Sequence, residues 1–179
     1  MISAARSTAF DILRKVEAGG YASDLLLARG KGMDSRDAGL AQEIVFGVLR
    51  YRAQLDHLTA HYSGRRQKLD VEVRIALRMG IYQLRYLERI PAHAAVAESV
   101  ELVKRARKRS AAGLVNAILR QVDRGPIAWP SREVALSCPE WLLARWERQF
   151  NTEIAEGIAR ARSQRSGLRS PPALNAVSF

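Results

Sequence analysis

The fold is decided by residues 90–124, IPAHAAVAESVELVKRARKRSAAGLVNAILRQVDR. On both sides of the central Lys/Arg cluster, apolar residues recur every three or four positions, which is the spacing of an amphipathic helix. Alanines crowd the first half, so this helix is expected to pack tightly at the centre of a helical bundle. Pro91 breaks whatever helix precedes it. The stretch therefore predicts two helices joined by a basic turn.

The rest of the chain shows the same periodicity. Apolar residues recur at helical spacing almost throughout, and alternating patterns typical of strands are absent. One helix is predicted to end at Gly19-Gly20, another to begin after a cap at Asp34, and a third to begin near Asp70. Gly80 lies inside this third helix, where Gly costs roughly 1 kcal/mol relative to Ala. Such a Gly is usually kept for close approach between helices. The helical periodicity along the chain predicts an all-α fold.

The composition changes at residues 125–130, GPIAWP, which indicates a linker or a domain edge. Ser137 and Glu140 frame a predicted capping box that opens a helix. Thr152 is predicted to cap a last helix that ends near Gln164, and the residues after it are rich in Ser, Gly and Pro. We therefore predict a helical domain over residues 1–125, a short helical connector over residues 126–165 and a flexible tail over residues 166–179.

The charge of the chain points to a polyanionic partner. Lys and Arg number 29 against 18 Asp and Glu, which gives a net charge of +11 and an isoelectric point near 10.6. Basic side chains gain affinity for nucleic acid because they release the counterions condensed on its phosphates. A basic protein of membrane surfaces is the main competing class, and charge that serves only solubility is the plainest alternative.

Several other classes of protein are excluded. The single cysteine, Cys138, excludes an internal disulfide and a multi-Cys metal site. No apolar stretch is long enough to span a bilayer and no signal peptide opens the chain, so a cytoplasmic protein is expected. His57 and His61 have a spacing that can hold zinc, but the Glu of a zincin motif and a third ligand are missing, and no metal site is predicted.

No catalytic motif is recognisable in the sequence. It contains no glycine-rich phosphate loop after a strand, no Gly-x-Ser-x-Gly and no pair of carboxylates that can be placed together. Cys138 precedes Pro139 at a predicted helix start, a position that can lower the pKa of a thiol, but no partner base is visible. We therefore interpret Cys138 as part of a capping region, and we predict neither catalytic residues nor a cofactor.

The basic clusters are the candidate functional residues. Four cations fall between Arg105 and Arg109, in the predicted turn, where guanidinium groups and free helix-terminal N–H groups can face phosphates together. A smaller cluster occupies residues 65–68, and the first predicted helix has a basic edge. The residues predicted to contact RNA are Arg6, Arg14, Lys15, Arg65, Arg66, Lys104, Arg105, Arg107, Lys108, Arg109, Arg120 and Arg124.

The aromatic residues argue against stacking of single-stranded bases as the main mode of recognition. They make up 7% of the chain, and Tyr51, Tyr62 and Tyr82 fall on apolar stripes, so we expect them in the core. Recognition by shape and phosphate contacts is favoured instead. Asn116 is flanked by predicted core positions, and we expect it to fasten its helix to a neighbouring backbone by a hydrogen bond rather than to contact RNA.

Four blocks of sequence resemble the NusB-type RNA-binding domain. AARSTAFDILRKV at residues 4–16 resembles its opening helix, EIVFGVLR at residues 43–50 and LRMGIYQL at residues 77–84 resemble two further helices, and residues 91–124 supply the strongest match. The resemblance implies an all-α bundle of two packed helical subdomains, followed here by a short helical connector. The positions in these blocks to which we assign a structural role are Gly47, Gly80, Pro91 and Asn116.

One branch of this family is the closer match. SCPEWLLARW at residues 137–146 resembles the connector of RsmB (Sun/Fmu) rRNA cytosine-5 methyltransferases, in which the NusB-type domain precedes an S-adenosylmethionine-binding catalytic domain. PPALN at residues 171–175 resembles the point where that catalytic half begins. The chain ends at Phe179, without a cofactor loop or the family's catalytic Cys. The resemblance therefore implies a non-catalytic, rRNA-binding domain, from a truncated or split gene or acting with a separate methyltransferase catalytic chain.

Two alternatives remain open at this point. A free-standing NusB-like transcription antitermination factor would bind boxA-type RNA together with ribosomal protein S10. A helical bundle for protein interaction would carry its charge only incidentally. Neither alternative requires a cofactor, a metal or a membrane.

Overall fold

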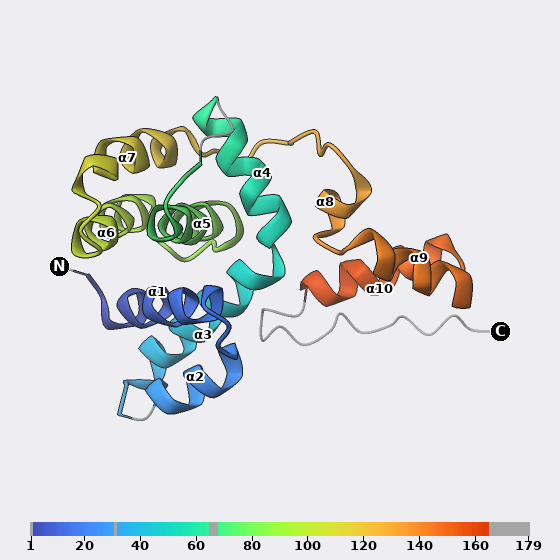
Figure 1. Ribbon diagram of the computed structural model, residues 1–179, viewed down its shortest axis with the longest axis horizontal. Coiled ribbons are helices and arrows are strands. Elements are labelled where there is room, and N and C mark those ends of the chain that lie inside the picture. Colours follow the sequence, from blue (N-terminus) through green and yellow to red (C-terminus); the bar gives the residue numbers. More distant parts are fainter. Residues whose placement is uncertain (1, 31, 65–67, 165–179) are drawn as a thin grey trace.

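The computed structural model describes residues 2–30, 32–64 and 68–164, and all regular structure within these ranges is helical (Figure 1). The prediction of an all-α fold is thus confirmed. The elements are α1 (Ala4–Glu17), α2 (Ala22–Gly30), α3 (Ser35–Arg50), α4 (Arg52–Ser63), α5 (Val71–Tyr86), α6 (Ala92–Arg105), the 3-10 turn η1 (Arg109–Ala111), α7 (Ala112–Gln121), α8 (Arg132–Leu136), α9 (Glu140–Gln149) and α10 (Thr152–Gln164).

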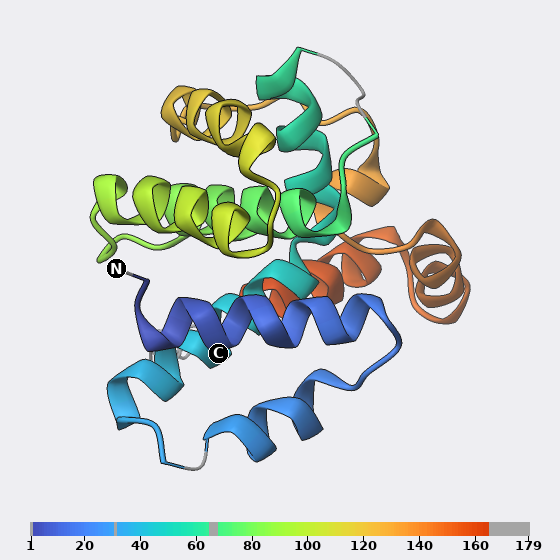
Figure 2. The same cartoon turned by 60° about the vertical axis from the view of Figure 1, so that its left-hand side comes forward.

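The central helix of the body is α5, and not the alanine-rich α6 that was expected there. Almost every residue from Val73 to Gln83 is buried, and the helix packs against α1, α3, α4, α6 and α7. α1 and α5 run in opposite directions, since Arg6 bonds to Gln83 at one end and Arg78 bonds to Glu17 at the other. α1–α3 lie on one side of the body and α4–α7 on the other (Figure 2), which agrees with two packed helical subdomains.

Gly80 lies where three helices of the body meet. A Cβ at this position would stand 2.6 Å from Cδ1 of Leu119 on α7 and 3.0 Å from Oγ of Ser99 on α6. The predicted reason for this mid-helix glycine, close approach between helices, is confirmed. Pro91 also has the predicted role, because α5 ends before it at Tyr86 and α6 begins directly after it.

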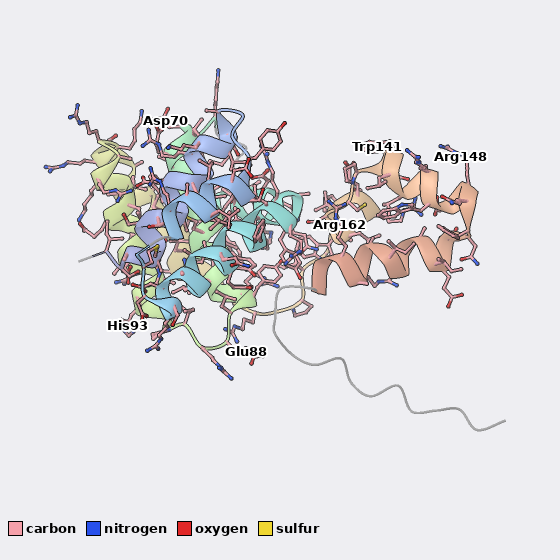
Figure 3. The ribbon with its side chains drawn as sticks, turned by 90° about the horizontal axis from the view of Figure 1, so that it is seen from below. Asp70, Glu88, His93, Trp141, Arg148 and Arg162 are labelled. Atoms are coloured by element: carbon pink, nitrogen blue, oxygen red, sulfur yellow. The ribbon has the colours of Figure 1, made fainter. Side chains whose placement is uncertain are left out.

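α8, α9 and α10 form a smaller unit after the body. Figure 3 shows α9 and α10, drawn in orange, side by side and standing away from the body. Gln54 on α4 joins the two parts: its side-chain amide donates to the carbonyl of Ala135 (2.6 Å), and its backbone N–H donates to the hydroxyl of Ser137 (3.3 Å). The buried apolar cluster of this unit consists of Leu136, Cys138, Leu143 and Ala159.

Helix caps were predicted with mixed success. Asp34 caps α3 as predicted, because its Oδ2 accepts from the N–H of Arg36 at 3.1 Å. Ser137 does not open α9 in a capping box. It ends α8 in a left-handed conformation, with φ of 44°, and α9 begins after Pro139 without a side-chain cap. α8 was not predicted at all, since five residues are too few for a helical period to stand out.

Two further local predictions are corrected. Asn151, and not Thr152, caps α10, because the Oδ1 of Asn151 accepts from the N–H of Ile154 at 2.8 Å. Asn116 is half-buried on α7, and its side chain makes no hydrogen bond within the part of the chain that the structure describes. The expectation that Asn116 fastens α7 to a neighbouring backbone is therefore wrong.

Candidate nucleic-acid interface

The turn between α6 and α7 is closed by two backbone hydrogen bonds. The N–H of Arg107 donates to the carbonyl of Lys104, and the N–H of Lys108 donates to the carbonyl of Val103, each at 3.0 Å. This pair of bonds is the Schellman motif, in which the residue after the helix cap is left-handed and usually glycine. Here that residue is Arg107, with φ of 63°. An L side chain in this conformation costs about 1 kcal/mol relative to glycine.

Arg105 ties the turn to α1. Its guanidinium donates to Oδ1 of Asp11 at 2.6 Å and to the hydroxyl of Ser7, and it lies 5.7 Å from the centre of the Phe10 ring. These contacts join residues more than ninety positions apart in the sequence. Arg105 therefore fixes the turn on the body, and α6 runs in the same direction as α1 beside it (Figure 2).

Lys104 and Lys108 also pair with carboxylates. Nζ of Lys104 lies 2.6 Å from Glu101, and Nζ of Lys108 lies 2.9 Å from Asp70, just before α5. The hydrogen bond from Lys104 lowers the pKa of Glu101, and the hydrogen bond to Asp70 raises the pKa of Lys108. Both pairs are exposed to solvent, where ion pairs contribute little to stability. They position the lysines without burying them.

Arg107 and Arg109 are different from their neighbours. Both side chains are exposed, and neither forms an ion pair with any residue that the structure describes. The turn thus combines three tethered cations with two untethered arginines. Such a pair can form new charge-assisted hydrogen bonds without breaking existing ones.

Arg6 is not an available RNA contact. Its side chain is only 7% exposed; its Nε donates to Oε1 of Gln83 at 2.6 Å and its Nη1 donates to Oε1 of Glu98 at 2.7 Å. Ser3 completes the network, because its N–H and hydroxyl both donate to the other oxygen of Glu98. The prediction for Arg6 is corrected: this arginine clamps the start of α1 to α5 and α6.

Arg124 also serves the fold. Its Nε donates to the carbonyl of Leu84 and its Nη2 to the carbonyl of Leu87, each at 2.9 Å, so it satisfies carbonyls at the end of α5. The guanidinium that was predicted to contact RNA therefore donates hydrogen bonds to backbone carbonyls of the fold. Arg120, by contrast, is exposed on α7 and has no ion pair within the described ranges.

Arg14 and Lys15 lie on the exposed edge of α1. Arg14 stands 3.5 Å from Glu72 on α5, and Lys15 has no ion pair among the residues described. Arg65 and Arg66, the remaining predicted contacts, lie outside the described residues. Between the end of α1 and the first turn of α5 runs a surface groove, whose charged lining consists of Asp11, Arg14, Lys15, Glu17, Arg29 and Glu72.

A cluster of three arginines at the end of α1 was not predicted. Glu17 accepts from Arg78 at 2.8 Å and lies 3.3 Å from Arg52 and 3.4 Å from Arg74. Arg78 also donates to both oxygens of Asp56, at 2.7 and 2.8 Å. Burial alone would raise the pKa of Glu17, but the hydrogen bond from Arg78 and the three positive charges outweigh it and lower the pKa.

The sequence held one signal for this cluster. Arg74 and Arg78 are four residues apart and interrupt the apolar helix α5, and that spacing puts two side chains on the same face. Arg52 and Glu17 lie on other helices, and their place beside these arginines follows only from the packing of α1 and α4 on α5.

The tyrosines of the body stack on one another. The rings of Tyr51 and Tyr86 are 4.5 Å apart and those of Tyr82 and Tyr86 are 5.5 Å apart. Burial raises the pKa of Tyr86 to about 12. Of the three tyrosines expected in the core, Tyr82 is buried there, and Tyr51 and Tyr62 are partly buried and pack against it. Tyr21 is 77% exposed.

The described residues offer little for metal or nucleophilic chemistry. Within them, no three His, Cys, Asp or Glu side chains are grouped so as to hold a metal ion. Cys138 is buried in the connector, and burial raises the pKa of its thiol, the opposite of what a nucleophile needs. None of the helices in this part of the chain has the length and apolar character to cross a membrane.

The chain is similar in sequence to proteins that share one name, ribosomal RNA small subunit methyltransferase B. The chain is 34% identical over 166 residues to the probable ribosomal RNA small subunit methyltransferase B of Bacillus subtilis, a match of 87% of this chain and 37% of the relative. It is 41% identical to ribosomal RNA small subunit methyltransferase B of Thermus thermophilus (86% and 38%) and 43% identical to that of Pseudomonas putida (71% and 31%). The chain thus spans between 31% and 38% of the length of these relatives.

The body of the fold has its own match. The family model of the NusB family matches residues 3–124, which run from the residue before α1 to three residues past the end of α7. The match includes the buried glycines of α3 and α5 and the basic turn between α6 and α7. The chain belongs to the NusB family.

Proposed function

We propose that this chain binds RNA and that its target is small-subunit rRNA. Two facts support the proposal: the chain belongs to the NusB family, and the relatives named above are small-subunit rRNA methyltransferases. In this proposal residues 1–125 are the RNA-binding body and residues 126–165 the connector. The tail predicted over residues 166–179 lies outside the described residues.

The observation that carries the proposal is the left-handed Arg107. A Schellman turn is least strained with glycine at this position, and the chain instead places there an exposed arginine with no ion pair among the described residues. Backbone strain of this kind gathers at functional sites. A contact between Arg107 and an RNA phosphate would explain why an arginine occupies this strained position, because its side chain has no ion pair among the described residues.

The form of the turn favours contacts to the RNA backbone. Arg107 and Arg109 project from a turn that Arg105 holds on α1. Arginine matches a phosphate with two parallel N–H donors, and phosphate contacts position a protein on RNA without reading bases. The stacked tyrosines are packed in the core, so we propose recognition by shape and charge and not by base stacking.

We propose that these residues contribute recognition and not methyl transfer. The relatives are named for methyl transfer as whole proteins, and this chain spans 37% of the Bacillus subtilis relative. In our proposal the chemistry belongs to a methyltransferase catalytic domain, either in the same polypeptide or in a separate chain, with the NusB-type body holding the rRNA.

The test is an anisotropy titration of labelled RNA with the full chain. The ligands are a hairpin from small-subunit rRNA, a boxA-like single strand and a DNA duplex, each measured over a salt series. The variant Arg107→Gln/Arg109→Gln removes the two untethered charges of the turn. The control Arg145→Gln/Arg148→Gln removes two exposed charges from α9, at the far side of the connector (Figure 3).

We expect the rRNA hairpin to bind best. The turn variant should lower its affinity about tenfold and flatten the slope of log K against log salt by about 1.5, the loss of two phosphate contacts. The control should stay within about twofold of wild type. Preference for the single strand, above all with ribosomal protein S10 added, would favour antitermination instead. Equal weak binding to all three ligands would contradict the proposal.

A further inference from the structure

The three arginines around Glu17 are unequally satisfied. Arg78 is 4% exposed and has two carboxylate partners, Glu17 at 2.8 Å and Asp56 at 2.7 Å. Among the residues that the structure describes, Arg52 and Arg74 pair only with the same Glu17, at 3.3 and 3.4 Å. One carboxylate thus faces three guanidinium groups, and its shortest bond goes to the buried one. Arg52 and Arg74 are the arginines left with weak partners.

Arg52 and Arg74 are also the accessible members of the cluster. Their side chains are 51% and 33% exposed. Nε of Arg74 has no hydrogen-bond partner in the described part of the chain, although its surroundings shield it from water. That shielded Nε is out of reach of a ligand. The exposed part of each side chain, held only by a long ion pair, can gain from a stronger acceptor, because hydrogen bonds to ionised groups are the strong ones.

The groove beside α1 contains one carboxylate partner from each of the two sites. Its lining includes Asp11, the partner of Arg105, and Glu17, the partner of Arg52 and Arg74. Glu17 lies six positions after Asp11, which is a rise of about 9 Å along an α-helix. A single RNA backbone can contact both sites over this distance.

The groove itself is lined by equal numbers of cations and carboxylates, three of each. The arginines paired with Asp11 and Glu17, which are Arg105, Arg52 and Arg74, give the whole path its excess of positive charge. Arg14, Lys15 and Arg29 are the cations of the lining, and Lys15 has no ion pair among the residues described. Arg29 lies 3.3 Å from Asp11 and Arg14 lies 3.5 Å from Glu72, distances that leave both ion pairs loose. The path is therefore a positively charged surface with weakly held side chains.

We propose that Arg52 and Arg74 form a second phosphate-binding site for the RNA backbone, which reaches it from the α6–α7 turn along the groove beside α1. The inference rests on the proposed RNA-binding function. Glu17 holds the two arginines side by side in the free protein. A phosphate has more acceptor oxygens than the shared carboxylate offers, so it can bond to both guanidinium groups at once.

The experiment compares the full-length variant Arg52→Gln/Arg74→Gln with wild type in titrations of the rRNA hairpin over a salt series. We expect about a five- to tenfold loss of affinity and a salt slope lower by about 1.5. The variant Arg52→Lys/Arg74→Lys keeps the charge but not the fork of donors. It should keep most of the slope and still lose affinity. Arg145→Gln/Arg148→Gln again serves as the charge-matched control.

Each outcome separates this inference from the proposed function. Wild-type affinity and slope in Arg52→Gln/Arg74→Gln, together with a loss in Arg107→Gln/Arg109→Gln, would overturn the second site and leave RNA binding in place. A loss equal to that of the α9 control would overturn it as well, because the charge would then act generically. Circular dichroism checks the fold. If the double variant unfolds, Arg52→Gln alone decides, since Arg52 is half exposed and its ion pair with Glu17 is long.

Discussion

Gly47 on α3 lies directly against the ring of Tyr82 on α5. A Cβ at position 47 would come within 3.0 Å of Cζ, Cε1 and Oη of that tyrosine, which is closer than real Cβ atoms pack. One turn earlier on α3, Glu43 accepts a hydrogen bond from the Tyr82 hydroxyl at 2.6 Å. The Tyr82 ring thus packs against the backbone of α3 at Gly47, and its hydroxyl bonds to Glu43. The ring therefore sets the distance between α3 and α5.

We expect Gly47→Ala to destabilise the protein. The added methyl has no room unless Tyr82 moves, and overpacking of this kind costs about 3 kcal/mol. Gly39→Ala is the matched control, because Gly39 is exposed on the same helix and its Cβ would meet nothing within 4 Å. That control should gain up to about 1 kcal/mol from helix propensity alone. Urea unfolding measures both, and equal effects of the two variants would contradict the close packing.

Arg6→Met should cost about 3 kcal/mol, because the variant leaves a buried carboxylate and amide without their partner. Glu98 would keep only Ser3, and Gln83, which is 0% exposed, would lose the bond to its Oε1. Arg14→Met is the control: its pair with Glu72 is 3.5 Å long and half exposed, so the loss should stay below about 1 kcal/mol. Thermal unfolding of both variants measures the two losses of stability. A small loss in Arg6→Met would show that the Arg6 clamp contributes little to stability.

Stability should fall in acid partly through Glu17. Its pKa in the folded chain lies below the ordinary 4.5, because Arg78 and two further arginines favour the carboxylate despite its burial. Above pH 4.5 the carboxylate is ionised in both states and its contribution is complete. Below that value the unfolded chain takes up the proton first, so this contribution is lost as the pH falls through the lower, folded pKa.

The measurement is the Tm of wild type and Glu17→Gln between pH 6 and pH 3. We expect the variant to be less stable than wild type at pH 6 and the difference in Tm to shrink towards pH 3. Protonation of Glu17 in wild type then removes the same negative charge that the substitution has already removed. Glu153→Gln, an exposed residue on α10 with no ion pair within the described ranges, is the control. A difference that stays constant with pH would show that Glu17 acts by packing and not by charge.

Periodicity was enough to predict the body of the fold. Gly80 and Pro91 could be interpreted correctly because each has a strong local effect, one on helix spacing and the other on helix ends. α8 escaped prediction, since it is short and its position depends on the contact between Gln54 and Ala135. Cap residues were harder to predict for the same reason: the Ser137 hydroxyl accepts a hydrogen bond from the backbone N–H of Gln54, a partner 83 positions away.

The candidate site could be predicted only in outline. The basic turn is visible in the sequence because four of its cations are consecutive or nearly so. The roles of single arginines are not, since a long cationic side chain on a helix can reach solvent, a buried carboxylate or a free carbonyl with equal ease. Arg6 was therefore assigned to RNA although it is buried in a clamp of the fold, and the bonds of Arg124 to backbone carbonyls were not foreseen. The cluster of Arg52 and Arg74 around Glu17 was not predicted either.

Arg107→Gly should move stability and RNA affinity in opposite directions. Glycine relieves the left-handed strain at φ 63°, and the gain, reduced by the greater freedom of glycine in the unfolded chain, should be about 0.5 kcal/mol. The same change removes the untethered guanidinium, so affinity for the rRNA hairpin should fall severalfold. Arg107→Gln keeps the strain while losing the charge, and should lose affinity without gaining stability. If Arg107→Gly bound RNA as well as wild type, the strained arginine would have no role in RNA binding, and the turn would have to be explained by the fold alone.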